Sequence, residues 1–408
     1  MRKETTPLKH GLLWFGAAVS IAEIVVGTGL APLGFNKALA AIILGHIIGG
    51  TMMFLAGLIG ARTRRGAMET VKLAFGSAGG HFFSALNITQ LVGWTAVMIA
   101  LGATAMKSVW QSPHPATLGL GLGILIAMWI YVGKDDIAKI SLVTMSAMFG
   151  LCLLASKIVF FGGGGAAEGA AAAATAAEGG ITFAQAVELS AVMPLSWLPL
   201  ISDYTRDARA KPVRTTLAGV LVYGITSCWM YALGVGLALY AGGEEIALVM
   251  KNAGFGIAAV AIIVASTVTT TFMDAFSAGV SASSIGKRIP EKAAALTVCA
   301  IGTIAAMFAD TDKYHTFLYF IGSVFAPMIA VQVADYFIIN GKKSPEDSAD
   351  KKIRILPFAA WASGFAAYHA ALHYDITTPL GLAAPIIAFT AILYCAANLC
   401  LPRKLRRG

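Results

Sequence analysis

Long apolar runs separated by short polar segments dominate this sequence. A helix of about 20 apolar residues crosses the hydrocarbon core of a bilayer. Runs of about this length occur near residues 11–33, 38–60, 82–106, 117–132, 137–161, 182–202, 213–241, 255–286, 293–309, 314–339, 354–372 and 378–400. The pattern predicts an all-α polytopic membrane protein with twelve transmembrane helices.

The composition supports a membrane setting. Apolar residues make up 57% of the chain and charged residues only 12%, whereas soluble domains contain about 25% charged residues. Neither a His-Glu-x-x-His nor a Gly-x-Ser-x-Gly motif is present, which argues against a membrane enzyme. We also find no nucleotide-binding signature, so an ion gradient is the expected energy source, and we expect no cofactor.

Lysine and arginine are distributed asymmetrically between the predicted loops. With the N-terminus in the cytoplasm, 25 of the 30 basic residues fall on the cytoplasmic side, as the bias of cytoplasmic loops towards positive charge requires. We therefore expect both termini to be cytoplasmic and the protein to lie in the cell inner (plasma) membrane. The net charge of +9 follows from this bias, so it indicates a lipid bilayer rather than nucleic acid as partner.

The order of the spans suggests a duplication. Five predicted spans precede a Gly/Ala-rich segment and five follow it. Two copies of a five-span unit must have opposite membrane orientations, as in the inverted repeats of many secondary transporters. We expect a first repeat at 1–161, an external linker at 162–181, a second repeat at 182–341, and two additional spans with a basic tail at 342–408.

The first span of each predicted repeat contains residues that interrupt a helix. The first span contains Gly27, Gly29 and Pro32, and the sixth contains Pro194 and Pro199 around Trp197. A broken helix exposes backbone amides and carbonyls at mid-membrane, where they can bind a cation or a polar ligand. A simple kink is the alternative explanation for either span alone.

Two carboxylates stand in otherwise apolar spans. Glu23 is the only acid between Lys9 and Lys37, and Asp274 is the only ionisable residue between Lys251 and Lys287. A charge at that depth costs roughly 2.5–3.5 kcal/mol on insertion scales, so such acids usually face a polar partner, an ion or a substrate. We interpret the chain as a carrier whose substrate meets these acids.

Polar residues also line up along two other helical faces. Asn87, Gln90 and Trp94 share one face of the third span. On the eighth span Ser266, Thr270 and Asp274 recur every four residues, and Thr269 and Thr271 flank them. Hydroxyl groups in membrane helices often bond only to their own helix, so this stripe has a structural as well as a functional explanation.

Three segments carry a resemblance to a known family. The stretch Leu13–Glu23, the motif Ser-Asp-Tyr-Thr-Arg at 202–206 and the run Asp-Ala-Phe-Ser-Ala-Gly at 274–279 resemble the nucleobase:cation symporter-1 family. Within it the chain is most similar to the hydroxymethylpyrimidine permeases associated with thiamine-precursor salvage. The resemblance implies a fold like that of the bacterial leucine transporter, with a five-plus-five inverted repeat and a substrate site between a four-helix bundle and a scaffold.

The resemblance also implies roles for individual residues. The family binds its heteroaromatic substrate with the first, third, sixth and eighth spans, which points to Glu23, Asn87, Gln90, Trp94, Trp197 and Asp274. Thr269 and Thr270 are the expected sodium ligands, together with carbonyls at the break in the first span. Glu23 is either a further substrate ligand or a proton carrier, so the coupling ion is sodium or a proton.

The expected substrate is a pyrimidine, most of all 4-amino-5-hydroxymethyl-2-methylpyrimidine. An aminopyrimidine presents a ring nitrogen beside an exocyclic amine, and a carboxyl group can match both with two hydrogen bonds. A permease for cytosine or another nucleobase is the alternative, as is an amino-acid transporter of the same fold. A substrate-sensing receptor is a further class, disfavoured because the loops are too short for a signalling domain. The sequence leaves the oligomeric state open.

Overall fold

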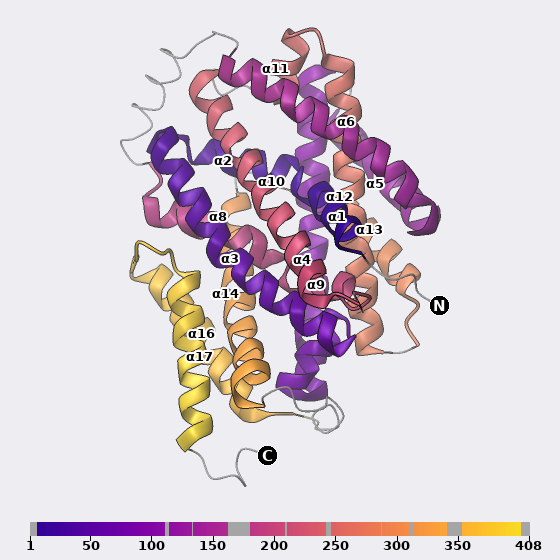
Figure 1. Cartoon of the computed structure of the whole chain (residues 1–408). Helices are drawn as coiled ribbons and strands as arrows, with labels where there is room; N and C mark the ends of the chain where they lie inside the picture. Colours follow the sequence, from indigo (N-terminus) through magenta and orange to yellow (C-terminus); the bar gives the residue numbers. More distant parts are fainter. Residues whose placement is uncertain are drawn as a thin grey trace.

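The structure is a computed structural model that describes residues 6–110, 114–132, 134–161, 180–208, 210–241, 246–286, 288–309, 313–340 and 353–400. All regular structure within these ranges is helical (Figure 1). In chain order the elements are α1 (Pro7–Ala18), α2 (Ile21–Gly29), η1 (Ala31–Leu33), α3 (Phe35–Thr63), α4 (Ala67–Val109), α5 (Pro115–Val132), α6 (Lys134–Phe161), α8 (Phe183–Ser196), α9 (Leu198–Thr205), α10 (Pro212–Tyr240), α11 (Ile246–Asn252), α12 (Gly256–Ile285), α13 (Glu291–Ala306), α14 (Tyr314–Val333), the π-helical η3 (Ala334–Ile339), α16 (Ile355–His373) and α17 (Ala383–Cys400).

The helices confirm a polytopic α-helical membrane protein. In the part of the chain that the structure describes, nine segments are long and apolar enough to span a membrane, or ten if the bent pair α1 and α2 counts as one. The predicted spans at 137–161 and 293–309 correspond to α6 and to α13, which has 16 residues. The count of twelve remains a prediction. Most of the 162–181 linker, the basic loop and the tail beyond residue 400 lie outside the described residues.

The outer surface suits contact with lipid. Large apolar side chains such as Ile225 and Ile257 are 71% and 84% exposed, whereas Glu23 and Asp274 are only 2% and 4% exposed. Exposed apolar and buried polar side chains are the arrangement that a hydrocarbon solvent favours, because polar groups there need partners inside the protein.

The first span is broken, but not where the sequence suggested. Helices α1 and α2 are bent by 52° relative to each other, and the break lies at Val19 and Ser20 rather than near Gly27, Gly29 and Pro32. Ser20 has an extended backbone, and its hydroxyl accepts a hydrogen bond of 3.1 Å from the Ala22 amide. A serine cap therefore begins a new helix without a glycine or a proline.

Gly27 has a different function, which is to let α2 approach α10. A Cβ atom on Gly27 would lie 2.9 Å from backbone carbon atoms of Tyr231, and one on Gly234 would lie 2.9 Å from the Thr28 amide nitrogen. Such contacts are too short for any side chain. Two glycines that face each other thus allow two membrane helices to pack backbone against backbone.

The sixth span is broken where it was predicted. Helix α8 ends at Ser196, α9 begins at Leu198, and Trp197 lies between them. The backbone carbonyls of Ser196 and Pro199 accept hydrogen bonds from the third-span amides of Gln90 and Asn87, at 3.2 and 3.3 Å. Side chains of α4 therefore satisfy carbonyls at the break.

Two predicted helix starts were wrong. The third span begins at Ala67 rather than near residue 82, and it changes direction at Gly76, whose φ of 79° is in the left-handed region. The Arg354 amide donates to the Phe75 carbonyl at this kink, over 3.2 Å. The twelfth span begins at Ala383 rather than 378. Helices α16 and α17 (yellow) lie together at one edge of the bundle, beside α14 (Figure 1).

Candidate substrate and cation site

A cavity lies where the two helix breaks meet. It is lined by residues of α1, α2, α4, α8 and α12 and of both breaks: Ala17, Ser20, Ala22, Glu23, Trp94, Met98, Met193, Ser196, Trp197, Thr270 and Asp274. Of the eight predicted site residues, the structure brings Glu23, Trp94, Trp197, Thr270 and Asp274 together here.

The two carboxylates of the cavity have few partners. Glu23 lies in the first turn of α2, where the helix dipole favours negative charge. Its Oε1 accepts a long hydrogen bond of 3.5 Å from the Tyr223 hydroxyl, and its Oε2 has no partner among the described residues. Within the same part of the chain, no hydrogen bond to Asp274 is formed. Both acids can therefore bind a ligand or an ion.

The two tryptophans are held by other aromatic rings. The Trp197 Nε1 donates to the Tyr223 hydroxyl at 3.0 Å, and the Trp14 ring packs edge-on against Trp197 with centroids 5.2 Å apart. Trp94 has Tyr314 and Phe317 of α14 edge-on at 5.9 and 5.5 Å. Neighbouring aromatic rings therefore hold both tryptophans in place, and both border the cavity.

The two predicted amides lie behind the cavity rather than in its lining. Asn87 Nδ2 donates to the Ser281 hydroxyl at 2.8 Å as well as to Pro199, and Gln90 Nε2 donates to Asn87 Oδ1 at 2.8 Å. The Gln90 Oε1 has no partner among the described residues. These amides hold the break in the sixth span, and a role in substrate binding remains a prediction.

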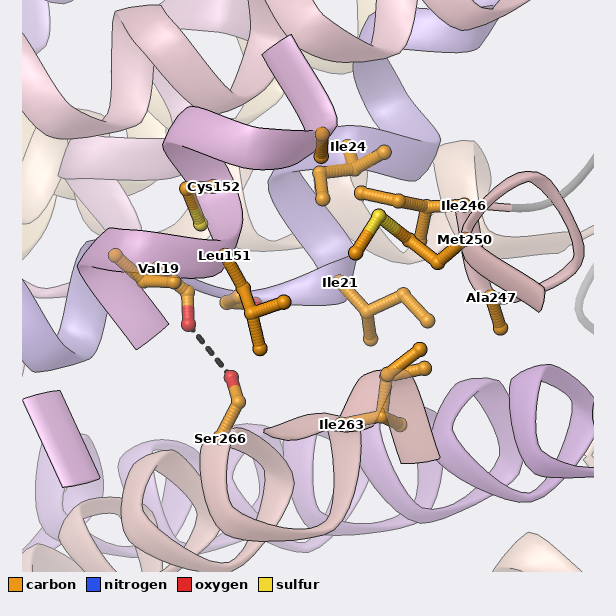
Figure 2. A pocket seen from close by; sticks show the side chains of 13 residues that line it. Val19, Ile21, Ile24, Leu151, Cys152, Ile246, Ala247, Met250, Ile263 and Ser266 are labelled. Carbon is orange, nitrogen blue, oxygen red and sulfur yellow. Dashed lines mark hydrogen bonds between the residues drawn. The ribbon is translucent and has the colours of Figure 1, made fainter. Parts of the chain in front are cut away.

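The predicted sodium ligands differ from each other. Thr270 lines the cavity, and its hydroxyl has no partner in the described chain. The Thr269 hydroxyl donates back to its own helix, to the Ala265 carbonyl at 2.9 Å. One turn away, the Ser266 hydroxyl donates to the Val19 carbonyl at the first break over 2.6 Å (Figure 2). Hydroxyl and carbonyl oxygens of this kind fit a hard cation.

A second cavity lies on the other face of the first break. Figure 2 shows its walls of isoleucine, leucine and methionine side chains from α2, α6, α11 and α12. Ser20 and Ser266 are its polar side chains. A space with such walls tends to stay dry, so we do not place the polar substrate in it.

Contacts between α9, α12 and α4 lie on the side of the cavity where the 202–206 motif ends the sixth span. The Tyr204 hydroxyl donates to the Met273 carbonyl at 3.1 Å, and Asp203 accepts from the Ala67 amide at the start of α4 over 2.8 Å. Both residues belong to the 202–206 motif. The motif thus links the half-helix below the break to its neighbours.

The sequence analysis missed Tyr223 of α10. Its hydroxyl connects Glu23 to Trp197 and is fully buried. Tyr223, Thr226, Ser227 and Tyr231 form a polar stripe within an apolar span, and this stripe is the signal that could have identified it. Met98, Met193 and Ser196 line the cavity as well, but nothing in the sequence distinguished them.

A bundle of apolar helices, with two of them interrupted around one enclosed polar cavity, defines a membrane transporter. The family model for permeases for cytosine/purines, uracil, thiamine and allantoin matches residues 2–385. The chain belongs to this family, and it is a permease rather than an enzyme.

Individual relatives agree with this assignment. The Bacillus subtilis (strain 168) protein YxlA, whose name describes a purine-cytosine permease, is 22% identical over 81% of this chain and 76% of the relative. The fold matches Mhp1, a nucleobase-cation-symport-1 family transporter closed around bromovinylhydantoin, with a TM-score of 0.80 at 15% identity, over 97% of this chain and 93% of Mhp1. A Na⁺-coupled sialic acid symporter matches with a TM-score of 0.69 at 14% identity, over 98% and 91%.

Proposed function

We propose that this permease is a cation-coupled importer of a pyrimidine, with 4-amino-5-hydroxymethyl-2-methylpyrimidine as the preferred substrate. The observation that carries the proposal is the cavity between the two helix breaks, in which two carboxylates and two tryptophans meet. Its aromatic walls suit the face of a heterocycle.

The recognition of the ring edge falls to Asp274 and Glu23. A carboxyl that lacks protein partners can accept from the exocyclic amine of an aminopyrimidine and, when protonated, donate to the adjacent ring nitrogen. Without a ligand, such buried polar atoms remain unpaired, so a substrate that lacks this edge is strongly disfavoured. Trp94 and Trp197 would hold the two faces of the ring.

Cytosine is the second candidate, because it also presents an exocyclic amine beside a ring nitrogen. The family description includes cytosine and purines, and the name of YxlA describes a purine-cytosine permease.

The coupling ion in this proposal is sodium or a proton. Two ionised carboxylates in one enclosed cavity repel each other, so a bound cation or a proton must offset their charge. For sodium we propose Thr269 and Thr270 as ligands with carbonyl oxygens of the first break. The Thr269 hydroxyl uses its proton within its own helix, which leaves its oxygen lone pairs for an ion. For a proton, Glu23 is the proposed carrier.

The pattern of helix packing supports the proposed five-plus-five inverted repeat. If α1/α2, α3, α4, α5 and α6 correspond to α8/α9, α10, α12, α13 and α14, three extensively or moderately packed pairs have counterparts. Helix α3 packs on α8 as α10 packs on α1, α13 packs on α4 as α5 packs on α12, and α6 packs on α12 as α14 packs on α4. In such a fold one repeat moves against the other around a fixed site.

We propose that the protein lies in the inner (plasma) membrane of the cell. In the proposed orientation both termini are in the cytoplasm. The distribution of basic residues supports it. In this orientation the 202–206 motif closes the cytoplasmic side, and the Tyr314 end of α14 faces the exterior.

Binding of a pyrimidine panel to the purified protein tests the proposal. We expect 4-amino-5-hydroxymethyl-2-methylpyrimidine to bind most tightly, cytosine next, and uracil, which lacks the exocyclic amine, at least tenfold more weakly, because an unpaired buried group costs about 1–3 kcal/mol. The panel is measured with and without sodium and across pH. Equal affinity for uracil and for the aminopyrimidine would contradict carboxylate recognition, and binding of a purine alone would replace the substrate class.

A further inference from the structure

A groove runs along the outer surface of the protein between α3 and α10, which pack side by side (Figure 1). The residues that line it fall within 43–54 of α3 and 217–228 of α10. Large apolar side chains on both helices are exposed along it, for example Ile47 at 60% and Ile225 at 71%. Because the chain spans a membrane, the groove opens towards lipid.

Two glycines form the floor of the groove. A Cβ atom added to Gly224 would meet no other atom of the described chain within 4 Å, and one added to Gly50 would meet only Val220, at 3.8 Å. At Gly45 and Gly49 of α3, by contrast, a Cβ atom would collide with the backbone of α8. The first two glycines therefore leave space that the protein does not fill, whereas the other two allow close packing of helices.

The polar side chains of the groove use their hydrogen-bonding atoms inside the protein. The Thr51 hydroxyl donates to a carbonyl of its own helix at 2.7 Å. Both nitrogens of the buried His46 lie within 2.9 Å of oxygen atoms of the core, among them the hydroxyls of Ser190 and Ser227. The Cys228 thiol, a weak donor, is the exception among the described lining residues. A hydrocarbon chain therefore suits this groove better than a polar ligand.

Helix α6 closes the groove at one end. Just beyond the groove, Trp229 Nε1 of α10 donates to the Ser156 hydroxyl of α6 at 2.9 Å. Further along α10, a Cβ atom on Gly236 would lie 2.7 Å from the Phe160 ring, so the two helices are in close contact there. The Phe160 ring also packs against Phe35 at the start of α3, with centroids 5.7 Å apart. Side chains of α6 thus fill the space between α3 and α10 towards this end.

Basic side chains lie at the other end of the groove. Arg214 precedes Leu217 by three residues, so it continues the same face of α10, and Lys211 lies three residues before Arg214. Both are exposed, and neither forms an ion pair with another described residue. The sequence from 206 to 214 contains four basic residues and one acid, Asp207. Positive charge without a partner in the described chain therefore stands at the open end of the groove.

We propose that the groove binds an anionic phospholipid, with one acyl chain between α3 and α10 and the phosphate at Arg214 and Lys211. Between Leu217 and Cys228 a helix rises by about 16 Å, and one leaflet contributes about half of the roughly 30 Å hydrocarbon core. The groove thus has the length of one leaflet. A transmembrane helix of a second copy would need about twice this length and would meet α6. The inference does not depend on which substrate the permease carries.

The lipid would support the helices that hold both broken spans. Helix α3 packs on α8 of the sixth span, and α10 packs on α1 and α2 of the first. An acyl chain that fills the groove buries apolar surface of α3 and of α10, so it holds this pair together. We expect the bound lipid to raise the unfolding temperature of the purified protein, because it binds the folded state alone.

Native mass spectrometry of the purified protein with added phosphatidylglycerol or phosphatidylcholine tests the proposal. Gly224→Leu places a side chain on the floor of the groove and should weaken phosphatidylglycerol binding about tenfold, the effect of about two methylene groups that lose their burial. Gly121→Leu is the matched control, because a Cβ atom on Gly121 of α5 would likewise meet nothing in the described chain within 4 Å. In detergent without lipid, both variants should unfold at the wild-type temperature, which separates a binding defect from a folding defect.

The same measurement with Arg214→Gln tests the position of the phosphate. We expect the wild type to prefer phosphatidylglycerol to phosphatidylcholine, and we expect the preference to fall about fivefold in the variant, the contribution of one basic residue near an anionic lipid surface. Arg288→Gln, at an exposed arginine that follows α12, is the control and should keep the preference. Equal binding of the two lipids by the wild type, or equal effects of the two substitutions, would contradict the proposal.

Photo-crosslinking locates the lipid in the wild-type protein without any substitution. The probe is a phosphatidylglycerol that carries a diazirine on its acyl chain, and we expect its crosslinks within 43–54 of α3 and 217–228 of α10. Crosslinks spread evenly over all lipid-facing helices, or Gly121→Leu as damaging to binding as Gly224→Leu, would overturn the proposal. A protein dimer in the native spectra that Gly224→Leu dissociates would make a second copy, in place of a lipid, the occupant of the groove.

Discussion

Among the buried carboxylates of the described chain, two pairs differ in how many hydrogen-bond donors they have. Glu188 of α8 accepts from the Tyr368 hydroxyl and, at 2.7 Å each, from the Leu382 and Ala383 amides at the start of α17. Asp335 of η3 accepts from the Tyr394 hydroxyl, from Asn340 at 2.9 Å and from Arg354 at 3.1 Å. Glu23 and Asp274 have almost none of these partners in the described chain.

The difference separates structural acids from candidate functional acids. A carboxylate with three donors is satisfied, and it fastens α16 and α17 to the core at both ends of these helices. An acid with unpaired oxygens is costly unless a ligand or an ion completes its shell. Burial alone does not distinguish the two pairs, since all four acids are at most 5% exposed. The number of hydrogen-bond donors around each acid distinguishes them.

The largest expected effect concerns the ion pair of Asp335 with Arg354, just before the start of α16. Arg354 also donates to the Leu73 carbonyl at 2.9 Å, so Arg354→Met removes an ion pair and a link to α4. Loss of one partner of a buried ion pair costs about 3–5 kcal/mol. We expect thermal unfolding of the purified protein at a clearly lower temperature than for wild type. Arg214→Met, at an exposed arginine, is the control. If both substitutions lowered the unfolding temperature equally, the ion pair of Arg354 would have no special role in stability.

A matched pair of substitutions compares the two classes of acid directly. Glu188→Gln replaces a charged acceptor of two backbone amides and should destabilise the fold by about 1.5–3 kcal/mol. Glu23→Gln replaces an acid with one long hydrogen bond, and we expect no loss of stability. Unfolding midpoints of the two variants, measured side by side, give the answer. The comparison is wrong if Glu23→Gln proves to be the more destabilised protein.

Asp274 should show the opposite behaviour to the structural acids. We expect Asp274→Ala to abolish uptake of 4-amino-5-hydroxymethyl-2-methylpyrimidine, because loss of a charged hydrogen-bond partner costs about 1.5–3 kcal/mol, or more than tenfold in affinity. Asp274→Asn should shift the preference towards cytosine. Neither change should lower the unfolding temperature. Normal uptake by Asp274→Ala, at equal amounts of protein in the membrane, would exclude Asp274 from the site.

The sequence predicted the spans well because hydropathy reports depth in the membrane. Predicted segments at 213–241 and 255–286 differ by one residue at each end from α10 and α12. The start of the third span was misplaced because residues 67–81 contain Glu69 and Lys72, which lowers the hydropathy of a segment that is helical and partly buried. The Lys72 ammonium group forms an ion pair with Glu69 at 2.6 Å and donates a hydrogen bond to the Ser284 carbonyl.

The sequence could not predict the roles of residues that depend on contacts between distant parts of the chain. Glu188 stands in an apolar span as Glu23 does, and its partner Tyr368 is 180 residues further along the chain. The break at Ser20 needs no glycine or proline, so composition pointed to Gly27 instead. The family resemblance, by contrast, supplied five of the eleven residues that line the cavity, because it reports which helices meet there.

The two tryptophans offer a smaller effect that sharpens the description of the cavity. Each stack of a base on an aromatic ring is worth roughly 1–3 kcal/mol, so Trp94→Ala or Trp197→Ala should weaken binding severely and the Phe variants mildly. Substrate should also quench tryptophan fluorescence, and less so in the double Phe variant. Trp229→Phe is the control, because Trp229 bonds to Ser156 away from the cavity. Undiminished quenching in the double variant would place the ring elsewhere.

The smallest expected effect distinguishes the two threonines and, with them, the coupling ion. A neutral hydroxyl ligand contributes about 0.5–1.5 kcal/mol, so Thr270→Val and Thr269→Val should each weaken sodium stimulation of uptake up to about tenfold, and the double variant should lose it. Thr297→Val, at an exposed hydroxyl that bonds within α13, should have no effect.

The measurement is uptake into proteoliposomes under an imposed sodium gradient or an imposed pH gradient, each alone. We expect the sodium gradient to drive accumulation, because the hydroxyl of Thr270 and the carbonyls of the first break offer the oxygen donors that sodium prefers. Glu23→Gln should leave the stimulation of uptake by the sodium gradient largely intact. Accumulation driven only by the pH gradient, and lost in Glu23→Gln, would instead make Glu23 the proton carrier. The two threonine hydroxyls would then have only a structural role, like the carboxylates of Glu188 and Asp335.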